Sequence, residues 1–531
     1  MRKLFAVVLA LALALSCCTA FAERLDSIPT TPHIEDGQYP VEGDKSLSWW
    51  MAINKSAVSF ISSYDENPAY QQVQTDTGID IRFIHPTVGM EKEQFQLMIV
   101  SGELPDIIML SDSNWYEGGL PQMHEDGLII DLTPYLENYA PQYKWIIDNN
   151  ADIQKAVCQG DDSDQVFGFW RCTLGDAIPF TRCIARADWL EEFGMEPPTT
   201  IEEYEAYFEA VLANKPGVVP FYMSLTSADQ QVLMMGAFDM CCNYFVVDGQ
   251  VHHYANEPAY KDYLALMNRW YEKGYMSKDF ASLTENEVLA LFDGGQLAMY
   301  TGNVDQAYNR TIDLADVKQI PLPYMRKNAD SVLHTDISNA PVSTGLACVS
   351  VITTACEDVE AALALLNYGY TWEGSVVYNW GTEGLTFEWG EDGMPHYTEF
   401  VSNNPDGKTT GNISYTNRIH LGSKVTWSDA VCGPGMTSKP DYAANRLLWS
   451  DDPNVDNSYR LPSLQLTADE SERRNEIMAE VNTYISEMKF KFITGDESLD
   501  HFDAYIEHVN AIGLMEAVEI TQAAYDRYMA Q

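Results

Sequence analysis

Short apolar runs alternate with segments of helical spacing in the first quarter of the chain. Residues 47–53, 79–85 and 106–110 are apolar runs of the length expected for buried strands. Two segments between them, residues 67–77 and 91–101, have the spacing of helices that bury one face. This strand–helix order predicts an α/β fold with a mainly parallel sheet covered by helices. Functional loops are then expected at the carboxyl ends of the strands.

Start signals mark further helices later in the chain. Thr200 to Glu203 and Thr467 to Glu470 each match a capping box, in which a threonine and a glutamate satisfy the first backbone N–H groups of a helix. Asp248-Gly249 lies between two strand-like runs and predicts a hairpin. Residues 357–370 predict another helix. There is no internal repeat, so we expect two α/β units without a disordered linker.

Composition narrows the classes of function. The chain has 531 residues, a length that suggests two or three domains, and 46% of them are hydrophobic, enough for a large core. Its formal net charge of −46 disfavours nucleic acids and anionic membranes as partners, because like charges repel. The same argument favours a neutral ligand over a polyanionic one.

The N-terminus has the pattern of an export signal. Arg2 and Lys3 precede an apolar run from Leu4 to Leu15, and Ala20 to Ala22 has the small-x-small pattern of a cleavage site. We therefore predict residues 1–22 to be a signal peptide and residues 23–44 to be a leader, with no later run long enough to span a membrane. Lipid attachment at Cys17 or Cys18 remains an alternative to simple secretion, although the residues before Cys17 match a lipoprotein signal poorly.

Cysteines and acidic runs do not predict a metal site. Eight cysteines remain after removal of the signal peptide, and none forms a C-x-x-C pair or has zinc-type spacing to histidine. Disulfides and free buried thiols both stay open. The acidic runs at residues 160–164 and 451–456 do not match a calcium-binding loop, so we interpret them as solvated turns and predict no metal or cofactor.

Catalytic motifs are absent apart from two short matches. The chain has no dinucleotide fingerprint, phosphate-binding loop, nucleophile elbow or zinc-protease motif. Ser486 to Lys489 fits S-x-x-K but lies inside a predicted amphipathic helix, and Asn256 to Pro258 resembles a glycosidase tripeptide at the start of a helix. We therefore predict a protein that is not an enzyme.

Several segments, in order from about residue 45 to the C-terminus, resemble one family. They are Leu97 to Ile108 (LMIVSGELPDII), Gly127 to Leu136, Val166 to Phe169, Arg186 to Leu190, Ala298 to Gly302, Lys491 to Gly495 and Ala524 to Tyr528. These motifs are similar to those of the extracellular solute-binding proteins of ABC importers, in the large sugar-type group related to lipoprotein LipO. Each match alone is weak, whereas the series is specific.

The resemblance implies a two-lobed periplasmic-binding-protein fold of type II, with a ligand cleft between the lobes. By analogy, residues 45–180 and 324–372 form lobe 1, and residues 181–323 and 373–531 form lobe 2. The implied partners are a sugar or oligosaccharide and the transmembrane subunits of an ABC permease, and we expect a monomer. The alternatives are a secreted glycoside hydrolase or lyase, or a peptide- or lipid-binding member of the same fold.

The predicted ligand-binding residues follow strands or lie where the lobes join. Sugars are bound by aromatic rings that stack on C–H surfaces and by polar groups that pair with hydroxyls. The candidates are Asn54, Asp112, Asn114, Trp115, Trp170, Arg171, Asn303, Trp380 and Glu383. Alternatives stay open, since Asp112 could cap a helix, Trp115 could belong to the core and Arg171 could pair with acids. We expect Trp49, Trp50 and Trp189 in the core.

Overall fold

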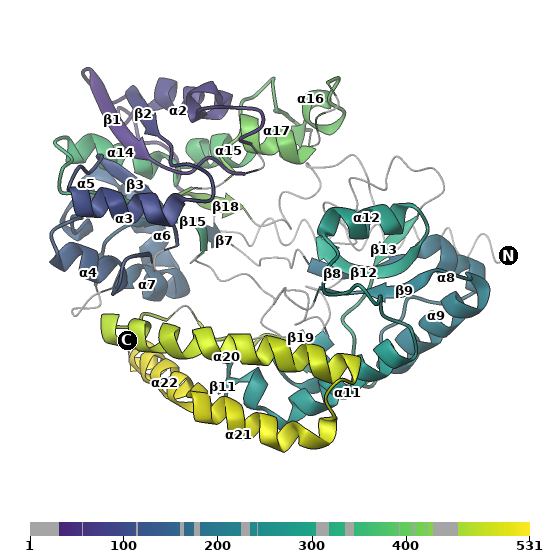
Figure 1. The fold of residues 1–531 in the computed structure, drawn as a ribbon. Helices are drawn as coiled ribbons and strands as arrows, with labels where there is room; N and C mark the ends of the chain where they lie inside the picture. Colours follow the sequence, from purple (N-terminus) through teal and green to yellow (C-terminus); the bar gives the residue numbers. More distant parts are fainter. Residues whose placement is uncertain are drawn as a thin grey trace.

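The computed structural model contains two lobes, each built on its own sheet and hydrophobic core (Figure 1). The structure describes residues 31–530 except for residues 56, 113–114, 160–163, 175–180, 225–233, 242, 304–317, 335–344, 392, 407, 409, 421, 428–454 and 463. The predicted signal peptide, Cys17 and Cys18 therefore lie outside the described residues, as do most of both acidic runs.

The three predicted N-terminal strands form the first sheet. β1 (Lys45–Trp50), β2 (Ile79–Ile84) and β3 (Ile107–Asp112) are parallel, which confirms the predicted order. Two later strands join them, because β15 (Gly345–Ile352) pairs antiparallel with β3 and β6 (Phe169–Trp170) pairs with β15. The strand order is β2-β1-β3-β15-β6. Segments more than 200 residues apart thus share one sheet.

Helices and short strand pairs complete the first lobe. Asn67 starts the first of these helices, because its side chain accepts a hydrogen bond from the N–H of Ala69 at 2.9 Å. The helices are α2 (Pro68–Thr77), α3 (Glu91–Ser101), α4 (Gly119–Glu125), α5 (Leu136–Tyr139), α6 (Pro141–Asn149), α7 (Ala151–Val157), α14 (Val359–Tyr368), α15 (Trp372–Trp380), α16 (Glu399–Ser402) and α17 (Thr410–Asn417). The strand pairs are β4 (Cys158–Gln159) with β5 (Gln165–Val166), β7 (Cys172–Leu174) with β18 (Val425–Trp427), and β16 (Phe387–Trp389) with β17 (Pro395–Tyr397).

The described part of the leader packs on the first lobe. The hydroxyl of Tyr39 donates to the carbonyl of Ala364 at 2.6 Å, and the N–H of Ile34 donates to Glu373 at 3.0 Å. These contacts join the leader to α14 and α15, so residues 31–44 belong to this lobe.

The second lobe surrounds a four-stranded sheet. Its strands are β8 (Thr181–Arg186), β9 (Val219–Tyr222), β12 (Leu297–Asn303) and β13 (Gln319–Pro321), in the order β13-β8-β12-β9. β12 runs antiparallel to β8 and parallel to β9. Its helices are α8 (Ala187–Phe193), α9 (Ile201–Asn214), α11 (Pro258–Glu272), α12 (Glu285–Asp293), α20 (Ala468–Thr494), α21 (Phe502–Ile512) and α22 (Leu514–Ala530), and β14 (Leu333–His334) pairs with β19 (Val455–Asp456).

The local signals in the second lobe act as predicted. Thr200 and Thr467 both form complete capping boxes, at the starts of α9 and α20. Asp248 and Gly249, both with positive φ, turn the chain between β10 (Tyr244–Val247) and β11 (Gln250–His253). The short S-x-x-K match lies inside α20, and Glu257 precedes α11, as expected for matches without catalytic meaning.

The two cores divide the chain differently from the predicted lobe boundaries. Tyr324 and Leu333 pack in the second core, and Val376, Trp380 and Trp427 pack in the first. The chain therefore leaves the first core after Leu174, returns after β14 and leaves again after Trp427. The predicted boundaries at 324 and 373 are both too early. The physical reason is that the sequence of an apolar helix such as α15 indicates which face is buried but not against which core that face packs.

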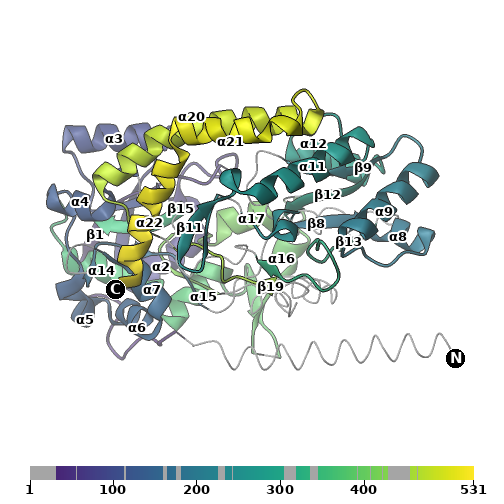
Figure 2. The ribbon, with the colours of Figure 1, turned by 90° about the horizontal axis from the view of Figure 1, so that it is seen from below.

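The C-terminal helices span both lobes. α20 and α22 extend from beneath the first lobe to the second in both views (Figures 1 and 2). The ammonium group of Lys155 on α7 lies 5.1 Å from the ring centre of Tyr528 on α22, although the buried apolar side chains of α20, together with Leu514 and Ala517 of α22, join the second core. These helices are therefore in contact with the first lobe while they are packed in the second.

Two smaller findings concern the cysteines and the possibility of a membrane-spanning helix. Cys158, Cys172, Cys183, Cys241 and Cys356 are free and buried, so disulfide formation is excluded for these five in this structure. Burial raises the pKa of Cys158 to about 11, which keeps the thiol protonated. Within the described ranges, we find no helix that has both the length and the apolar character of a membrane span.

Candidate functional site

The chain passes between the lobes next to a small parallel strand pair. β7 and β18 are the last described elements before two of these passages, and Val425 pairs with Cys172 in their register. Both strands lie on the side of the first lobe that faces β8 and β12 (Figure 1). Residues beside this pair are therefore placed where both lobes can reach one ligand.

A small cavity near this strand pair is lined by polar and aromatic side chains. The lining residues are Asn54, Tyr64, Tyr70, Tyr415, Arg418, Ile419 and His420. They come from the loop after β1, the first helical turns that follow it, α17, and the segment between α17 and β18. The cavity encloses about 10 Å³, room for about one water molecule. We interpret it as part of the floor of a larger site rather than as the whole site.

Hydrogen bonds hold Arg418 and His420 in one orientation. Arg418 Nη1 donates to the carbonyl of Asn379 at 2.9 Å and to the hydroxyl of Tyr397 at 2.8 Å. Its Nη2 lies 3.0 Å from Nδ1 of His420. Because a guanidinium can only donate, Nδ1 of His420 must accept, and the ring hydrogen resides on Nε2.

His420 is kept uncharged by its surroundings. Burial lowers the pKa of His420 well below its usual value, and the positive charges of Arg418, Lys424 and Arg171 lower it further. The imidazole is therefore neutral at physiological pH and offers one N–H donor. The ring centre of Tyr415 lies 4.4 Å from that of His420, so an aromatic ring stands next to the donor.

Two further cations flank this pair. Lys424 is 3% exposed, and its Nζ donates to the carbonyl of Ile419 at 2.7 Å and to Oδ1 of Asn379 at 3.2 Å. Arg171 precedes β7, and its Nε donates to Oγ1 of Thr426 at 3.1 Å. We call Arg171, Arg418, His420 and Lys424 the basic cluster.

Asn54 and Arg171 are the predicted site residues that the structure places at this location. Asn54 lines the small cavity, where its N–H donates to the Tyr64 hydroxyl at 3.1 Å, and Arg171 belongs to the basic cluster. Sequence reasoning missed Tyr64, Tyr415, Arg418 and His420. A signal was available in the dense polar and aromatic run Tyr415 to His420, but it follows no strand that the sequence predicted.

The predicted tryptophans lie deeper than expected. Trp170 is 1% exposed and Trp380 is 0% exposed, and both are part of the first core. Neither indole face is open to a ligand in this structure, because neighbouring side chains enclose both rings. Trp115 is half-buried against Trp50 and Phe95. Trp49, Trp50 and Trp189 are buried, which confirms the prediction that they are core residues.

The remaining predicted residues are spread along the lobe edges. Asp112 is the last residue of β3 and pairs with Gly345. Glu383 is exposed and forms an isolated β-bridge with Phe387. Asn303 ends β12 opposite Thr181, but its side chain lies outside the described atoms, and Asn114 lies outside the described residues. Their roles in ligand binding stay predictions.

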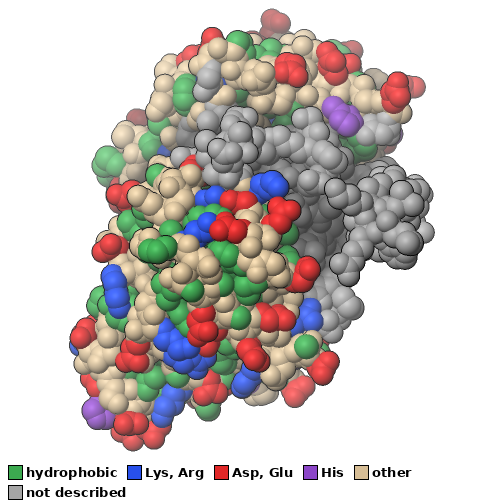
Figure 3. All heavy atoms as spheres, turned by 90° about the vertical axis from the view of Figure 1, so that its right-hand side faces the viewer, with side chains coloured by type: hydrophobic (Ala, Val, Ile, Leu, Met, Phe, Trp, Pro, Cys, Tyr) green, Lys and Arg blue, Asp and Glu red, His purple; other side chains and the backbone are tan. Residues whose placement is uncertain are grey.

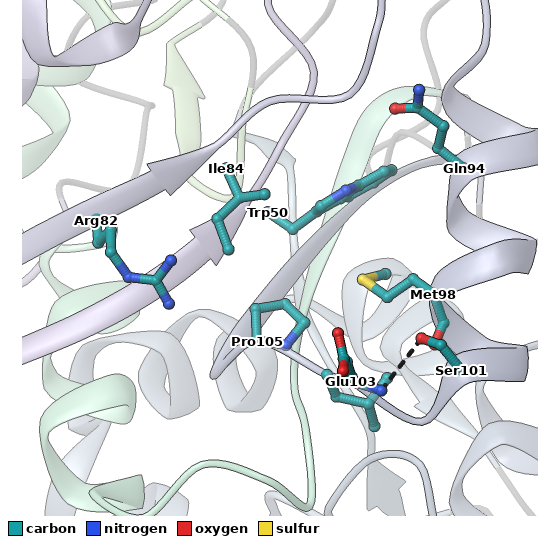
Figure 4. Close-up of a pocket in the computed structure, with 9 residues that line it drawn as sticks. Trp50, Arg82, Ile84, Gln94, Met98, Ser101, Glu103 and Pro105 are labelled. Carbon is teal, nitrogen blue, oxygen red and sulfur yellow. Dashed lines mark hydrogen bonds between the residues drawn. The ribbon is translucent and has the colours of Figure 1, made fainter.

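A larger cavity than the small one lies elsewhere on the first lobe. It has a volume of about 470 Å³ and lies between α3 and the strands β1 and β2, with Arg82 on one side of Trp50 and Gln94 and Met98 on the other (Figure 4). β2 is the edge strand opposite to β6, so this groove is at the far edge of the sheet from the strand that leads into β7. All the lining residues of this groove belong to the first lobe.

The strand of the second sheet that follows the first passage also bears an arginine. β8 begins at Thr181, directly after that passage, and Arg182 pairs with Gly302 in the register with β12. Arg182 is 0% exposed. Each lobe therefore has an arginine next to this passage, Arg171 in the first lobe and Arg182 in the second.

Comparison with known proteins identifies the family. Residues 62–371, more than half of the chain, match the family model of bacterial extracellular solute-binding proteins. The chain is 23% identical over 528 residues to the fructooligosaccharide ABC transporter substrate-binding protein FusA of Streptococcus pneumoniae, covering 94% of this chain and 93% of FusA. It is 21% identical over 511 residues to the polygalacturonan/rhamnogalacturonan-binding protein YtcQ of Bacillus subtilis, covering 92% and 93%.

A solved structure gives the same architecture. The HMO-binding solute-binding protein of Bifidobacterium longum infantis superposes with a TM-score of 0.73 at 17% identity, covering 92% of this chain and 99% of that one. The predicted two-lobed fold is thereby confirmed. These relatives and neighbours are binding proteins rather than enzymes, which confirms that prediction as well. The chain belongs to the family of bacterial extracellular solute-binding proteins.

Proposed function

We propose that the protein is the substrate-binding component of an ABC importer, which captures an oligosaccharide between its lobes and delivers it to a membrane permease. The observation that carries this proposal is the group of amide, phenol, guanidinium and imidazole side chains where the chain passes between two separately packed lobes. Such a mixture can stack on a sugar face and pair with its hydroxyls. The sequence-based expectation of a neutral oligosaccharide is the starting point for the ligand panel.

The proposed mechanism is binding without chemistry. An open form admits the ligand, rotation of the lobes about their connections encloses it, and the closed form docks on the permease. The apparent affinity then depends on the closing equilibrium as well as on the contacts, because only the competent state binds tightly. The two separate cores support this view, since each lobe can move as a rigid unit.

A ligand panel tests the proposal. Purified protein is screened by thermal shift against neutral oligosaccharides, acidic oligosaccharides and peptides. A true ligand at 100 times its Kd is expected to stabilise the protein by about 2.7 kcal/mol. Small-angle scattering with that ligand should show a smaller radius of gyration. Stabilisation by peptides alone, or cleavage of a saccharide in the same mixture, would reject the proposal.

A pair of tyrosine variants tests the location of the site. Tyr415→Ala should weaken saccharide binding by about tenfold, because it removes a ring beside His420 that could stack on the sugar. Tyr135→Ala is the matched control, since Tyr135 is an exposed tyrosine of the same lobe outside the small cavity. Equal effects of both variants would place the site elsewhere.

We further propose export by the signal peptide, with free secretion favoured over a lipid anchor, and a monomeric state. The described part of the leader is held against the first lobe, because the backbone N–H of Trp372 donates to the carbonyl of Pro32 at 2.9 Å. An anchored form would thus hold the first lobe next to the membrane. Mass spectrometry of the mature N-terminus distinguishes a cleaved Glu23 start from a lipid-modified cysteine, and light scattering gives the oligomeric state.

A further inference from the structure

The lobes also meet outside the passages between them, where the C-terminal helices reach the first lobe. Gly118 precedes α4 with a φ of 78°, and a β-carbon there would lie 3.1 Å from the Cβ of Ala468, the first residue of α20. On the same two helices of the first lobe, Lys155 of α7 lies 5.1 Å from the ring centre of Tyr528 of α22. We call Gly118, Lys155, Ala468 and Tyr528 the strap contact.

The ends of α20 and α22 form one unit that belongs to the second lobe. Arg527 donates to both carboxylate oxygens of Glu470, at 2.8 and 2.5 Å, and so joins the end of α22 to the start of α20. Gln522 of α22 accepts from the N–H of Val251 at 2.7 Å and donates to the carbonyl of Gly249 at 3.1 Å, in the hairpin of β10 and β11. The strap contact is therefore a contact between the lobes.

The side chain of Tyr528 packs against one face of α7. Asp152 and Lys155 are three residues apart on this helix, so they share a face. Burial raises the pKa of the Tyr528 phenol, and the carboxylate of Asp152 raises it further. The Lys155 ammonium group is attracted to the electron-rich face of the same ring. Both neighbours on α7 thus act on one half-buried ring of the other lobe.

The strap contact and the small cavity lie at opposite ends of the first lobe. In Figure 1, α4 and α7 are at its lower end, next to α20 and α22, and α17 is at its upper end. Tyr415 of α17 lines the small cavity. β7 and β18, from which the chain passes to the second lobe, lie between these ends (Figure 1). A rotation about the passages that brings the lobes together at the cavity therefore separates them at the strap contact.

We infer that the strap contact holds the lobes in an open arrangement and is released when they close on a saccharide. This inference rests on the proposed function and names a device that sets its closing equilibrium. The apparent Kd equals the intrinsic Kd divided by the fraction of molecules that are competent to bind. Weakening the strap contact raises that fraction, so it tightens binding although the contact is remote from the cavity.

Long-range charge is a weaker determinant of the lobe arrangement than this contact. The formal net charge of −46 would by itself push the lobes apart. Charges more than about 8 Å apart are, however, largely screened at physiological ionic strength. Basic side chains also lie among the acidic ones over much of the face shown in Figure 3, so this face has no field of one sign. Short contacts between the lobes therefore decide how easily they rotate.

The first test measures the distance between the lobes in the full chain. Ser402 of α16 and Ala290 of α12 are exposed, and both helices lie at the upper end of the molecule in Figure 1. Spin labels on Ser402→Cys and Ala290→Cys report their separation by pulsed electron resonance, and each single-cysteine variant measures background labelling. Tyr528→Ala should increase the population at the shorter distance before any saccharide is added. A saccharide that binds should shift the population in the same direction.

The second test measures affinity by calorimetry, with maltotriose, kestose and trigalacturonate as probes. Tyr528→Ala and Lys155→Ala should each tighten the binding of a probe by about two- to fivefold, the factor that corresponds to one cation–π contact. Ala468→Leu inserts a larger side chain into the close contact with Gly118 and should act in the same direction.

Lys278→Ala is the matched control for these variants. Lys278 lies 3.4 Å from the ring centre of Tyr271, and both residues belong to the second lobe. This variant removes a cation–π contact within one lobe, so it should change neither the distance nor the affinity. Circular dichroism checks that each variant folds, and Lys155→Ala, on the surface of a helix, keeps the test available if Tyr528→Ala does not.

The outcomes separate the strap from the proposed function. Unchanged distances and affinities in Lys155→Ala and Ala468→Leu overturn the strap, as does a longer distance with weaker binding. Either result leaves saccharide capture intact if a probe still binds. An absence of binding by every saccharide, including those of the thermal-shift panel, overturns the proposed function, and the distances measured without saccharide then still decide whether the contact holds the lobes open.

Discussion

The two lobes enclose arginine in different ways. In the second lobe, Arg186 is 6% exposed, its guanidinium bonds to both carboxylate oxygens of Asp188 at 2.6 and 2.8 Å, and its charge lies 4.4 Å from the ring centre of Trp189. In the first lobe, Arg418 is held by neutral groups beside two other cations. A buried charge with its own counter-ion is part of the packing. Arg418 is half-buried and has no carboxylate partner among the described residues, so neutral groups orient its charge instead.

The largest expected effect comes from breaking the pair in the second lobe. Asp188→Asn leaves the Arg186 charge buried without a counter-ion, and we expect a loss of about 3 kcal/mol in the free energy of unfolding. The measurement is urea unfolding followed by tryptophan fluorescence. Glu487→Gln, in an exposed pair with Lys491, is the control and should leave the midpoint unchanged. Similar midpoints for both variants would show that the Arg186 pair is not structural.

Acid should destabilise both lobes through histidines whose pKa values are lowered by their surroundings. Burial lowers the pKa of His253 in the second lobe to about 3, and it also lowers the pKa values of His85 and His420 in the first. Each folded-state pKa is below the unfolded value, so the unfolded chain binds protons first and stability is lost as the pH falls below about 6.5. For His253 the loss reaches about 2 kcal/mol near pH 5.

The histidine prediction is checked by unfolding in urea at about pH 7.5 and pH 5. His253→Asn should reduce the difference between the two pH values, whereas His508→Asn, which changes an exposed histidine, should not. A pH difference that is identical in wild type and His253→Asn would show that His253 is protonated equally in both states.

Local signals in the sequence were sufficient to predict parts of both lobes. The parallel strands β1, β2 and β3, the hairpin at Asp248-Gly249 and the capping boxes at Thr200 and Thr467 are all confirmed. Each depends on residues that are neighbours in the chain or repeat at a fixed spacing. The order of family motifs predicted the two-lobed fold, which no single motif could.

Contacts between segments that are far apart in the sequence could not be predicted from these local signals. β15 inserts between β3 and β6, and residues 373–427 return to the first core, so their partners lie far away in sequence. This is why Arg418 and His420 were missed, since only that return places them beside Asn54 and Arg171. Trp170 and Trp380 were instead predicted at the site but lie in the core, because a tryptophan suits a core and a sugar site equally well.

Removing the side chain that caps α14, in the first lobe, should have a moderate effect on the free energy of unfolding. The carboxylate of Asp358 accepts from the N–H of Ala361 at 3.1 Å, at the start of α14, and from Lys45 on β1 at 2.6 Å. The hydrogen bond from Lys45 is the largest cause of a lowered pKa of Asp358. Asp358→Ala should cost about 1 kcal/mol of unfolding free energy.

The cap prediction is measured by urea unfolding as a function of pH. Because the folded-state pKa of Asp358 is lowered, its contribution is present above about pH 4 and is lost as the pH falls through the folded value. Asp358→Asn retains an N-cap acceptor without the charge and should fall between wild type and Asp358→Ala. A larger loss in Asp358→Asn than in Asp358→Ala would contradict capping as the cause.

The smallest effect on stability is expected for Arg418→Gln, the counterpart of the first variant. The variant loses hydrogen bonds to Asn379, Tyr397 and His420, and removing one cation from the basic cluster offsets much of their contribution, so we expect a net loss below about 1 kcal/mol. After burial, the Arg418 charge is the largest cause of the lowered pKa of His420, so this pKa should rise in the variant while burial still holds it below its usual value. Histidine NMR titration measures the pKa, and urea unfolding measures the stability. A stability loss as large as that of Asp188→Asn, with the pKa of His420 unchanged, would contradict this prediction. It would mean that Arg418, like Arg186, mainly stabilises the fold.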